Sequence, residues 1–284
     1  MRTVLGILNI ILKITVKRNF KNGIRVKKLR QFDISIDNPL TTGGTAFKRI
    51  PAPEGNSQRV IVYFHGGAYV SGPDRNHLSL AIRLSKATGS DVLLVDYRRA
   101  PENTYIEAHI DAAAVYEYAL ENYPGEEIVI AGDSSGGGLA LAFTMSLRDA
   151  GGPLPSKLVM MSPWLDVSMS NPEISPAADV SDPVLSRAGL AEAGAMFAGS
   201  LPPGDYHVSP VLGRAGGMPP MLMLSSSLDI LVHDCRLFHR KCKAEGTPLI
   251  YSEYPGLFHA WILMPPVIRE AQQAFSEVVE FIID

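Results

Sequence analysis

The sequence is poor in cysteine and in net charge, and both shortages narrow its possible roles. Its two cysteines among 284 residues, Cys235 and Cys242, lie seven positions apart in a stretch that is expected to be helical. Two helical turns separate such positions by about 10 Å, which is beyond disulfide distance. Free thiols are typical of a reducing compartment, so we expect a cytoplasmic protein. The formal net charge of −3 provides no overall attraction for nucleic acid, and no nucleic-acid partner is expected.

Long apolar runs and metal-ligand spacings are also missing. The apolar stretch over about residues 4–16 is interrupted by Asn9 and Lys13, and it is shorter than the roughly 20 residues of a transmembrane helix. No small-residue cleavage site follows it, which argues against a signal peptide. No histidine pair shares a helix face with carboxylates at metal-ligand spacing, so no metal is expected. Five histidines are interpreted as solvated or packing residues: His77, His109, His207, His233 and His239.

The first thirty residues are basic, and the first acidic residue is Asp33. Asn9, Lys13 and Lys17 recur every four positions, which predicts an amphipathic helix with one narrow polar stripe. Such a helix either covers part of the protein or lies on a membrane surface. We favour the covering role and keep membrane contact as the alternative.

Most of the remaining chain alternates between short apolar runs and helix-like segments. Continuous apolar strands separated by helices are typical of a parallel sheet that is covered on both faces. We therefore predict a single α/β domain over residues 1–284, with eight strands, the first two joined by a hairpin-like turn. The expected strands are 32–36, 45–50, 60–64, 92–95, 128–131, 158–161, 221–224 and 249–254, and the expected helices are about 77–88, 106–121, 137–149, 183–198, 231–245 and 268–283.

Residues 132–136, Gly-Asp-Ser-Ser-Gly, lie between an apolar strand and a helix. In that context the pattern Gly-x-Ser-x-Gly is a nucleophile elbow. Ser134 has a glycine two residues before it and two after it, which lets strand and helix pass closely, whereas Ser135 has an aspartate at the first of these offsets. A phosphate-binding loop is excluded because Gly138 and Leu139 stand where its Lys and Ser/Thr belong. We predict that Ser134 is a nucleophile.

A serine hydroxyl needs a base to accept its proton, usually a histidine that a carboxylate orients. In open α/β sheets such groups follow the carboxyl ends of strands. His259 follows the strand that ends at residue 254, and Asp229 follows the strand that ends near residue 225. The chain order Ser134, Asp229, His259 is that of the α/β-hydrolase triad. Asp166 is a second candidate for the acid, whereas Asp234 lies a turn further into a helix.

An oxyanion hole needs backbone N–H groups that point at the reacting carbonyl oxygen. The strand over residues 60–64 leads into His65-Gly66-Gly67-Ala68, a loop of the HGG type that can turn its N–H groups towards the site. We expect Gly66 and Gly67 to donate from this loop. Ser135, the residue after the nucleophile, is expected to supply the other donor.

Three further motifs accompany the elbow and the HGG loop: Asp96-Tyr97-Arg98-Arg99-Ala100-Pro101-Glu102, Ser162-Pro163-Trp164-Leu165-Asp166 and Gly256-Leu257-Phe258-His259. With them, the chain from about residue 59 onward resembles the hormone-sensitive lipase-like (bacterial family IV) esterases. The resemblance implies an α/β-hydrolase fold and hydrolysis of carboxylic esters with short to medium acyl chains, without metal or cofactor. It also implies a helical cap formed by about residues 1–40 and about 168–217. We interpret the 96–102 motif as structural.

The sequence departs from the family pattern in three places. Ala68 stands where the family's HGGG loop has its third glycine, and Ser135 stands where the elbow usually has alanine. Both residues keep a backbone N–H, and the Ala68 methyl group is expected to narrow the pocket near the alcohol portion of an ester. Ile230 stands where the family often has proline after the triad acid.

An apolar acyl pocket is expected beside the triad. Its candidate residues are Ala68, Trp164, Met196, Phe197, Tyr206, Leu257 and Phe258. For the six other than Ala68, ordinary core packing is an equally good interpretation, since apolar residues mostly pack in cores.

The predicted reaction is hydrolysis of a small-molecule ester through an acyl-enzyme intermediate. A lactonase, amidase or deacetylase that uses the same triad stays open, as does a membrane-surface lipase. A non-catalytic ligand-binding protein has least support because the triad is complete. The sequence is compatible with a monomer or a homodimer.

Overall fold

The computed structural model describes residues 26–55, 57, 59–123, 127–264 and 268–284, and its centre is an eight-stranded sheet. The strands are β1 (Leu40–Thr42), β2 (Thr45–Ile50), β3 (Arg59–Phe64), β4 (Asp91–Asp96), β5 (Glu127–Asp133), β6 (Lys157–Met161), β7 (Met221–Ser226) and β8 (Leu249–Tyr254). Their order is β1-β2-β4-β3-β5-β6-β7-β8. β2 pairs antiparallel with β1 and β4, and all other neighbours are parallel. The expected mostly parallel sheet of eight strands is confirmed.

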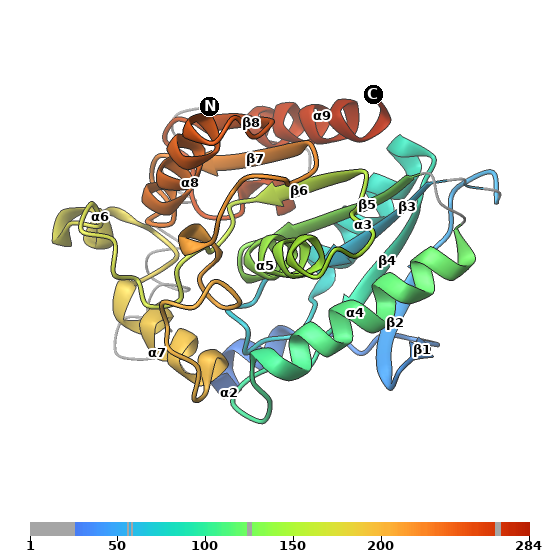
Figure 1. The fold of residues 1–284 in the computed structure, drawn as a ribbon, viewed down its shortest axis with the longest axis horizontal. Coiled ribbons are helices and arrows are strands. Elements are labelled where there is room, and N and C mark those ends of the chain that lie inside the picture. Colours follow the sequence, from blue (N-terminus) through green and yellow to red (C-terminus); the bar gives the residue numbers. More distant parts are fainter. Residues whose placement is uncertain (1–25, 56, 58, 124–126, 265–267) are drawn as a thin grey trace.

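Helices cover both faces of this sheet. The helices are α2 (Val26–Leu29), α3 (Arg75–Thr88), α4 (Tyr105–Asn122), α5 (Ser135–Asp149), α6 (Pro176–Ser181), α7 (Arg187–Ala198), α8 (Val232–Ala244) and α9 (Arg269–Ile283), with short 3-10 helices at Arg30–Phe32, Pro210–Leu212 and Trp261–Leu263. α4, α5 and α8 pack on one face, and α3 and α9 pack on the other (Figure 1). The sheet is therefore the middle of three layers.

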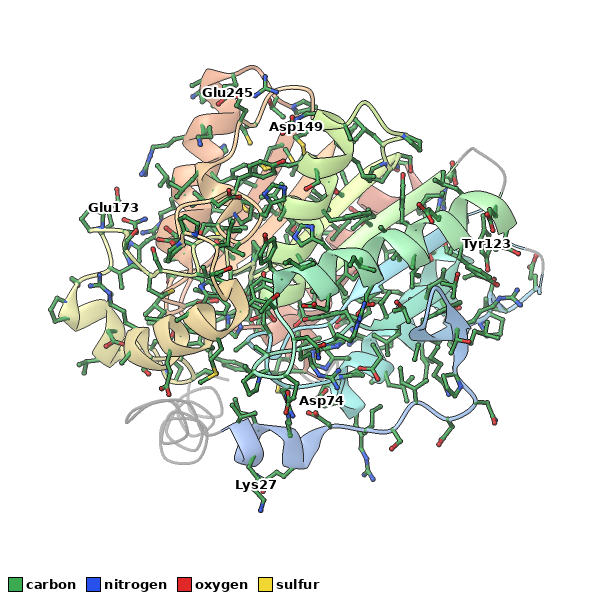
Figure 2. All side chains as sticks on the ribbon, turned by 60° about the horizontal axis from the view of Figure 1, so that its bottom comes forward. Lys27, Asp74, Tyr123, Asp149, Glu173 and Glu245 are labelled. Carbon is green, nitrogen blue, oxygen red and sulfur yellow. The ribbon has the colours of Figure 1, made fainter. Side chains whose placement is uncertain are left out.

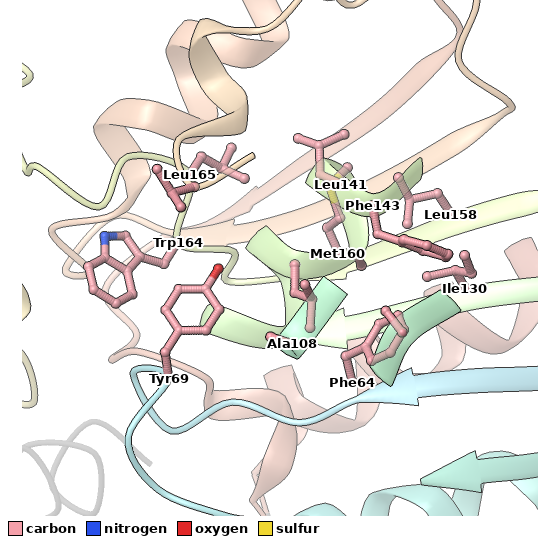
Figure 3. Packing of buried hydrophobic residues seen from close by; sticks show 14 of the residues in the cluster. Phe64, Tyr69, Ala108, Ile130, Leu141, Phe143, Leu158, Met160, Trp164 and Leu165 are labelled. Atoms are coloured by element: carbon pink, nitrogen blue, oxygen red, sulfur yellow. The ribbon is translucent and has the colours of Figure 1, made fainter. Parts of the chain in front are cut away.

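Each central strand contributes to two separate cores because its side chains alternate between the two faces. In β3, Val60, Val62 and Phe64 join the core beneath α4 and α5, whereas Ile61 and Tyr63 join the core beneath α3 and α9. Figure 3 shows the first of these cores, where side chains of β3, β5 and β6 meet those of α4 and α5. The unbroken apolar runs of the sequence thus have one physical cause: both faces of each strand are buried.

One expected strand is wrong. Residues 33–36 form no strand, and the first strand begins at Leu40 instead. The two-residue connection Gly43-Gly44, with both residues at positive φ, pairs Thr42 directly with Thr45. A hairpin with so short a turn takes its first strand from the residues immediately before the turn. The alternating pattern over residues 32–36 lies too far from that turn to pair with β2.

The long excursion between β6 and β7 carries α6 and α7, which lie beyond the carboxyl ends of the strands (Figure 1). Of the expected cap, the structure describes this excursion and residues 26–40, which include α2. The amphipathic helix that we expect within residues 4–17 lies outside the described residues. Within the described part of the chain, no helix is both long enough and apolar enough to cross a membrane.

Helix α7 begins at Arg187 and not at residue 183, where we expected it. The carboxylate of Asp182 accepts hydrogen bonds from the N–H groups of Val184 and Leu185, at 2.7 and 2.8 Å. Such side-chain bonds hold the backbone in a turn and compete with helix formation. The helix starts only after Ser186, whose hydroxyl accepts the N–H of residue 189 as its N-cap.

Candidate active site

Ser134 lies in the tight turn between β5 and α5, where its backbone has φ 51° and ψ −121°. A non-glycine residue rarely adopts this conformation, and the surrounding structure must hold it there. The Ser134 N–H donates to the carbonyl oxygen of Met161 at 2.9 Å. Its own carbonyl oxygen accepts from the N–H groups of Gly138 and Trp164, at 3.1 and 2.8 Å. These bonds tie the turn to β6, to α5 and to the segment after β6.

Two glycines make the turn possible. A Cβ atom on Gly136 would lie 2.0 Å from the carbonyl oxygen of Phe64, and one on Gly132 would lie 2.3 Å from the carbonyl oxygen of Gly136. Contacts this short do not occur in folded proteins. The absence of a side chain on Gly136 therefore lets the start of α5 pass against the end of β3, and its absence on Gly132 lets the end of β5 pass against the start of α5.

The imidazole of His259 lies between Ser134 and Asp229. Its Nε2 is 2.8 Å from the Ser134 Oγ, and its Nδ1 is 2.7 Å from the Asp229 Oδ2. The Asp229 carboxylate also accepts the N–H of Leu231 at 2.9 Å, which fixes its orientation. All three side chains are buried. The structure thus brings the three expected residues together in one hydrogen-bonded row.

Opposing effects set the pKa of His259. Burial favours the neutral imidazole and lowers the pKa, whereas the charge and hydrogen bond of Asp229 raise it, and Asp182 and Asp133 act in the same direction. The net result is a pKa above the ordinary value for histidine. This environment stabilises the imidazolium that forms when His259 takes a proton from a serine hydroxyl.

The two other candidate acids do not face His259. Asp166 accepts the N–H and hydroxyl groups of Ser168 and Ser170, so it braces the loop after β6. Asp234 accepts a bond from the Asn171 amide at 2.8 Å, and burial raises the pKa of Asp234 to about 7. Both carboxylates have their own partners elsewhere.

The HGG loop differs from expectation at its first glycine. The Gly66 N–H donates to the Asp133 Oδ1 at 3.0 Å, so it is not presented to the site as we expected. Gly67 and Ala68 follow in the loop and line the cavity beside Ser134. Neither of their N–H groups has an acceptor among the residues that the structure describes. Ser135 is the first residue of α5, directly after Ser134.

Asp133 connects the nucleophile turn to three other elements, a role that the sequence did not reveal. Its carboxylate accepts the Tyr63 hydroxyl at 2.6 Å as well as the Gly66 N–H, and it lies 3.4 Å from the Nε2 of His77. The Nδ1 of His77 lies 2.8 Å from the Asp74 carboxylate. Burial alone would lower the pKa of His77, but the two carboxylates raise it to about 10. His77 is therefore a buried residue, which agrees with the packing role that was one of the two expected for it.

A cavity of about 230 Å³ opens beside Ser134 and His259. Much of its lining is apolar: Leu29, Ala68, Val184, Leu185, Leu190, Ala260 and Leu263. The lining also includes the polar residues Ser71, Asp74, His77 and Asp133. Figure 2 shows Asp74 close to α2, whose exposed Lys27 points away from the protein.

Of the seven expected pocket residues, only Ala68 lines this cavity. Of the other six, four are buried in the core, Trp164, Phe197, Leu257 and Phe258, and two are partly buried and pack against it, Met196 and Tyr206. For example, the ring of Phe197 stacks on Tyr69, and Figure 3 shows Tyr69 beside Trp164. Their apolar character reflects packing in or against the core, so it could not predict which residues line the cavity.

Metal-binding arrangements are absent from the described residues, where no group of three or more His, Cys, Asp or Glu side chains is placed to hold an ion. Cys235 and Cys242 are buried free thiols on α8. The chemistry of the row at Ser134 is that of a serine nucleophile with a histidine base, which can attack an acyl carbon.

Residues 61–263 match the family model of the alpha/beta hydrolase fold. The chain belongs to this family. It is 34% identical over 231 residues to an acetyl-hydrolase from Streptomyces hygroscopicus, a match that covers 81% of this chain and 77% of that protein. It is 32% identical over 247 residues to an esterase from Acinetobacter venetianus, which covers 86% and 80%.

Solved structures agree with this assignment. The crystal structure of an esterase from the bacterial hormone-sensitive lipase family has a TM-score of 0.85 with this chain at 28% identity, and covers 99% of this chain and 96% of that one. The esterase EstE5, soaked with p-nitrophenyl butyrate, has a TM-score of 0.88 at 28% identity, and covers 98% and 97%. The expected fold class and the expected relation to hormone-sensitive lipase-like esterases are confirmed.

Replacing Gly136 tests the close approach of α5 to β3. Gly136→Ala places a methyl group against the backbone of Phe64, so we expect unfolding in urea to require about 3 kcal/mol less free energy. The matched control is Gly152→Ala, because a Cβ there lies 3.5 Å from its nearest neighbour, and a change within about 0.5 kcal/mol is expected. Equal stability of the two variants would contradict the close approach.

Proposed function

We propose that this protein, a serine ester hydrolase of the alpha/beta hydrolase family, cleaves esters with short to medium acyl chains through Ser134, His259 and Asp229. The observation that carries the proposal is the row of two hydrogen bonds, Ser134 Oγ to His259 Nε2 at 2.8 Å and His259 Nδ1 to Asp229 Oδ2 at 2.7 Å. A nucleophile, a base and an orienting carboxylate in this order are what acyl transfer to serine requires.

In the first half of the reaction, the Ser134 oxygen attacks the ester carbonyl carbon while His259 takes the hydroxyl proton. Asp229 holds the imidazole with Nε2 towards the serine and stabilises the cation that forms. The tetrahedral intermediate then collapses, and His259 returns the proton to the leaving alcohol. In the second half, His259 takes a proton from water as the water oxygen attacks the acyl carbon. His259 then returns this proton to the Ser134 oxygen as the bond between that oxygen and the acyl carbon breaks, which releases the carboxylic acid and restores the free enzyme.

The negative charge that forms on the carbonyl oxygen must be stabilised by hydrogen-bond donors close to that oxygen. We assign this role to the N–H groups of Gly67, Ala68 and Ser135, because the first two line the cavity and the Gly66 N–H is engaged by Asp133. Each such donor typically contributes about 3 kcal/mol to transition-state stabilisation. The Ala68 methyl group occupies space that a glycine would leave open.

The size and composition of the cavity support short to medium acyl chains. Its volume of about 230 Å³ is below the 300–1,000 Å³ typical of sites for drug-sized ligands. Leu185, Leu190 and Leu263 form part of its apolar wall. We also propose that residues 26–40 and the excursion with α6 and α7 act as a cap, since Leu29 and Leu190 come from these segments and line the cavity.

The nucleophile is tested by Ser134→Ala, assayed on p-nitrophenyl butyrate. We expect kcat to fall by about 10³-fold or more, because the covalent intermediate no longer forms. Ser146→Ala is the control, since Ser146 lies on the same helix, donates to the Ala142 carbonyl and does not line the cavity. A Ser134→Ala enzyme as active as the parent would rule out this nucleophile.

The acyl pocket is tested with p-nitrophenyl esters of two to twelve acyl carbons. We expect kcat/KM to peak at short chains and to fall once the chain outgrows the apolar wall. Leu190→Ala enlarges the cavity and is expected to move the optimum to longer chains by one or two carbons. The control is Leu212→Ala, because Leu212 is exposed and lies off the cavity. An unchanged chain-length profile in Leu190→Ala would exclude this wall as the acyl site.

A further inference from the structure

A second carboxylate, that of Asp182, is buried close to the catalytic acid. Asp182 lies in the connection between α6 and α7 and is fully buried. Its Oδ1 accepts the N–H groups of Val184 and Leu185, and its Oδ2 accepts the N–H of Ile230 at 2.9 Å. The loop of the excursion and the loop after β7 are therefore joined through one side chain.

Both ends of this connection reach the site. Ile230 directly follows Asp229, so the bond to Ile230 fixes the backbone that carries the catalytic acid. Val184 and Leu185 line the cavity, so the bonds at the other oxygen fix part of its apolar wall. A single carboxylate thus sets the distance between the wall that receives the acyl chain and the acid that orients His259.

We propose that Asp182 is a positioning residue for ester hydrolysis. It acts through Asp229 and His259, and it holds the apolar wall of the cavity at a fixed distance from them. This inference rests on the proposed function and extends it to the segment between β6 and β7. It gives the segment between α6 and α7 a role in the chemistry as well as in covering the site.

The electrostatic environment supports a role beyond packing. Burial and the neighbouring Asp229 raise the pKa of Asp182 above the ordinary value for aspartate, whereas its bonds from backbone N–H groups act in the opposite direction. Among the described residues, the charged groups that act most strongly on His259 are Asp229 from the loop after β7, Asp182 from the excursion and Asp133 from the end of β5. All three raise its pKa. Asp182 therefore assists Asp229 in stabilising the imidazolium.

A purely structural role would be met by the three hydrogen bonds alone, so the decisive readout is the pH dependence of kcat/KM. Its acid limb reports the pKa of His259 in the free enzyme. Asp182→Asn removes the charge, and the limb is expected to move to lower pH, with a several-fold lower kcat. Asp182→Glu keeps the charge, and its limb is expected to stay near the parent position even if its kcat falls.

Asp234→Asn is the matched control. Asp234 is also a buried carboxylate with a raised pKa, but its partner is Asn171 and it is not among the main groups that act on His259. Its limb is expected to coincide with that of the parent. A folded Asp182→Asn enzyme with an unmoved limb, or an equal shift in both variants, would overturn the proposal.

A measurement on the parent protein keeps the proposal testable if Asp182→Asn does not fold. The buried Ile230 amide donates to the Asp182 carboxylate at 2.9 Å, so its N–H is expected to exchange slowly with deuterium, and exchange as fast as that of an exposed amide would overturn the inference. This readout does not depend on turnover. Full activity of Ser134→Ala would instead refute the proposed function, so the two failures are distinguishable.

Discussion

The candidate site depends on how closely the nucleophile turn approaches the end of β3. Gly136 lies so near the Phe64 carbonyl that no side chain fits between them, and Asp133 accepts the Gly66 N–H across the same gap. The loop after β3 and the start of α5 are thereby locked together. The N–H groups of Gly67 and Ala68 and the hydroxyl of Ser134 consequently share one cavity. Rigid elements position such groups more accurately than free loops do.

His259 and Asp229 come from the loops after β8 and β7, which lie on the opposite side of β5 from β3 in the sheet. β7 and β8 run parallel to β6, so the loops that follow them end at the same edge of the sheet as Ser134. The polar groups gathered there are buried and must satisfy one another. Asp229 and Asp182 bind backbone N–H groups of the acid loop, and Asp133 binds the buried His77. The edge of the sheet is therefore held by two sets of carboxylates, one on each side of the nucleophile.

Local patterns in the sequence were sufficient for most of the fold and for the three residues of the row. The strands at 45–50 and 249–254 have the expected bounds, because apolar runs and turn residues act over a few positions. The pocket was not predictable in the same way. Leu190 and Phe197 lie on one helix and are both apolar, yet the first lines the cavity and the second stacks in the core. The role of Asp182 was not predictable either, because its bond to the Ile230 N–H joins positions 48 residues apart.

The backbone of Ser134 has an evolutionary consequence. Its positive φ costs of order 1–3 kcal/mol for a residue with a Cβ, and a glycine would relieve that cost. Stability and turnover therefore favour different residues at this one position. Under selection for stability alone, the lineage would drift towards a more stable, inert descendant of the same fold, and only continued selection on catalysis retains the serine.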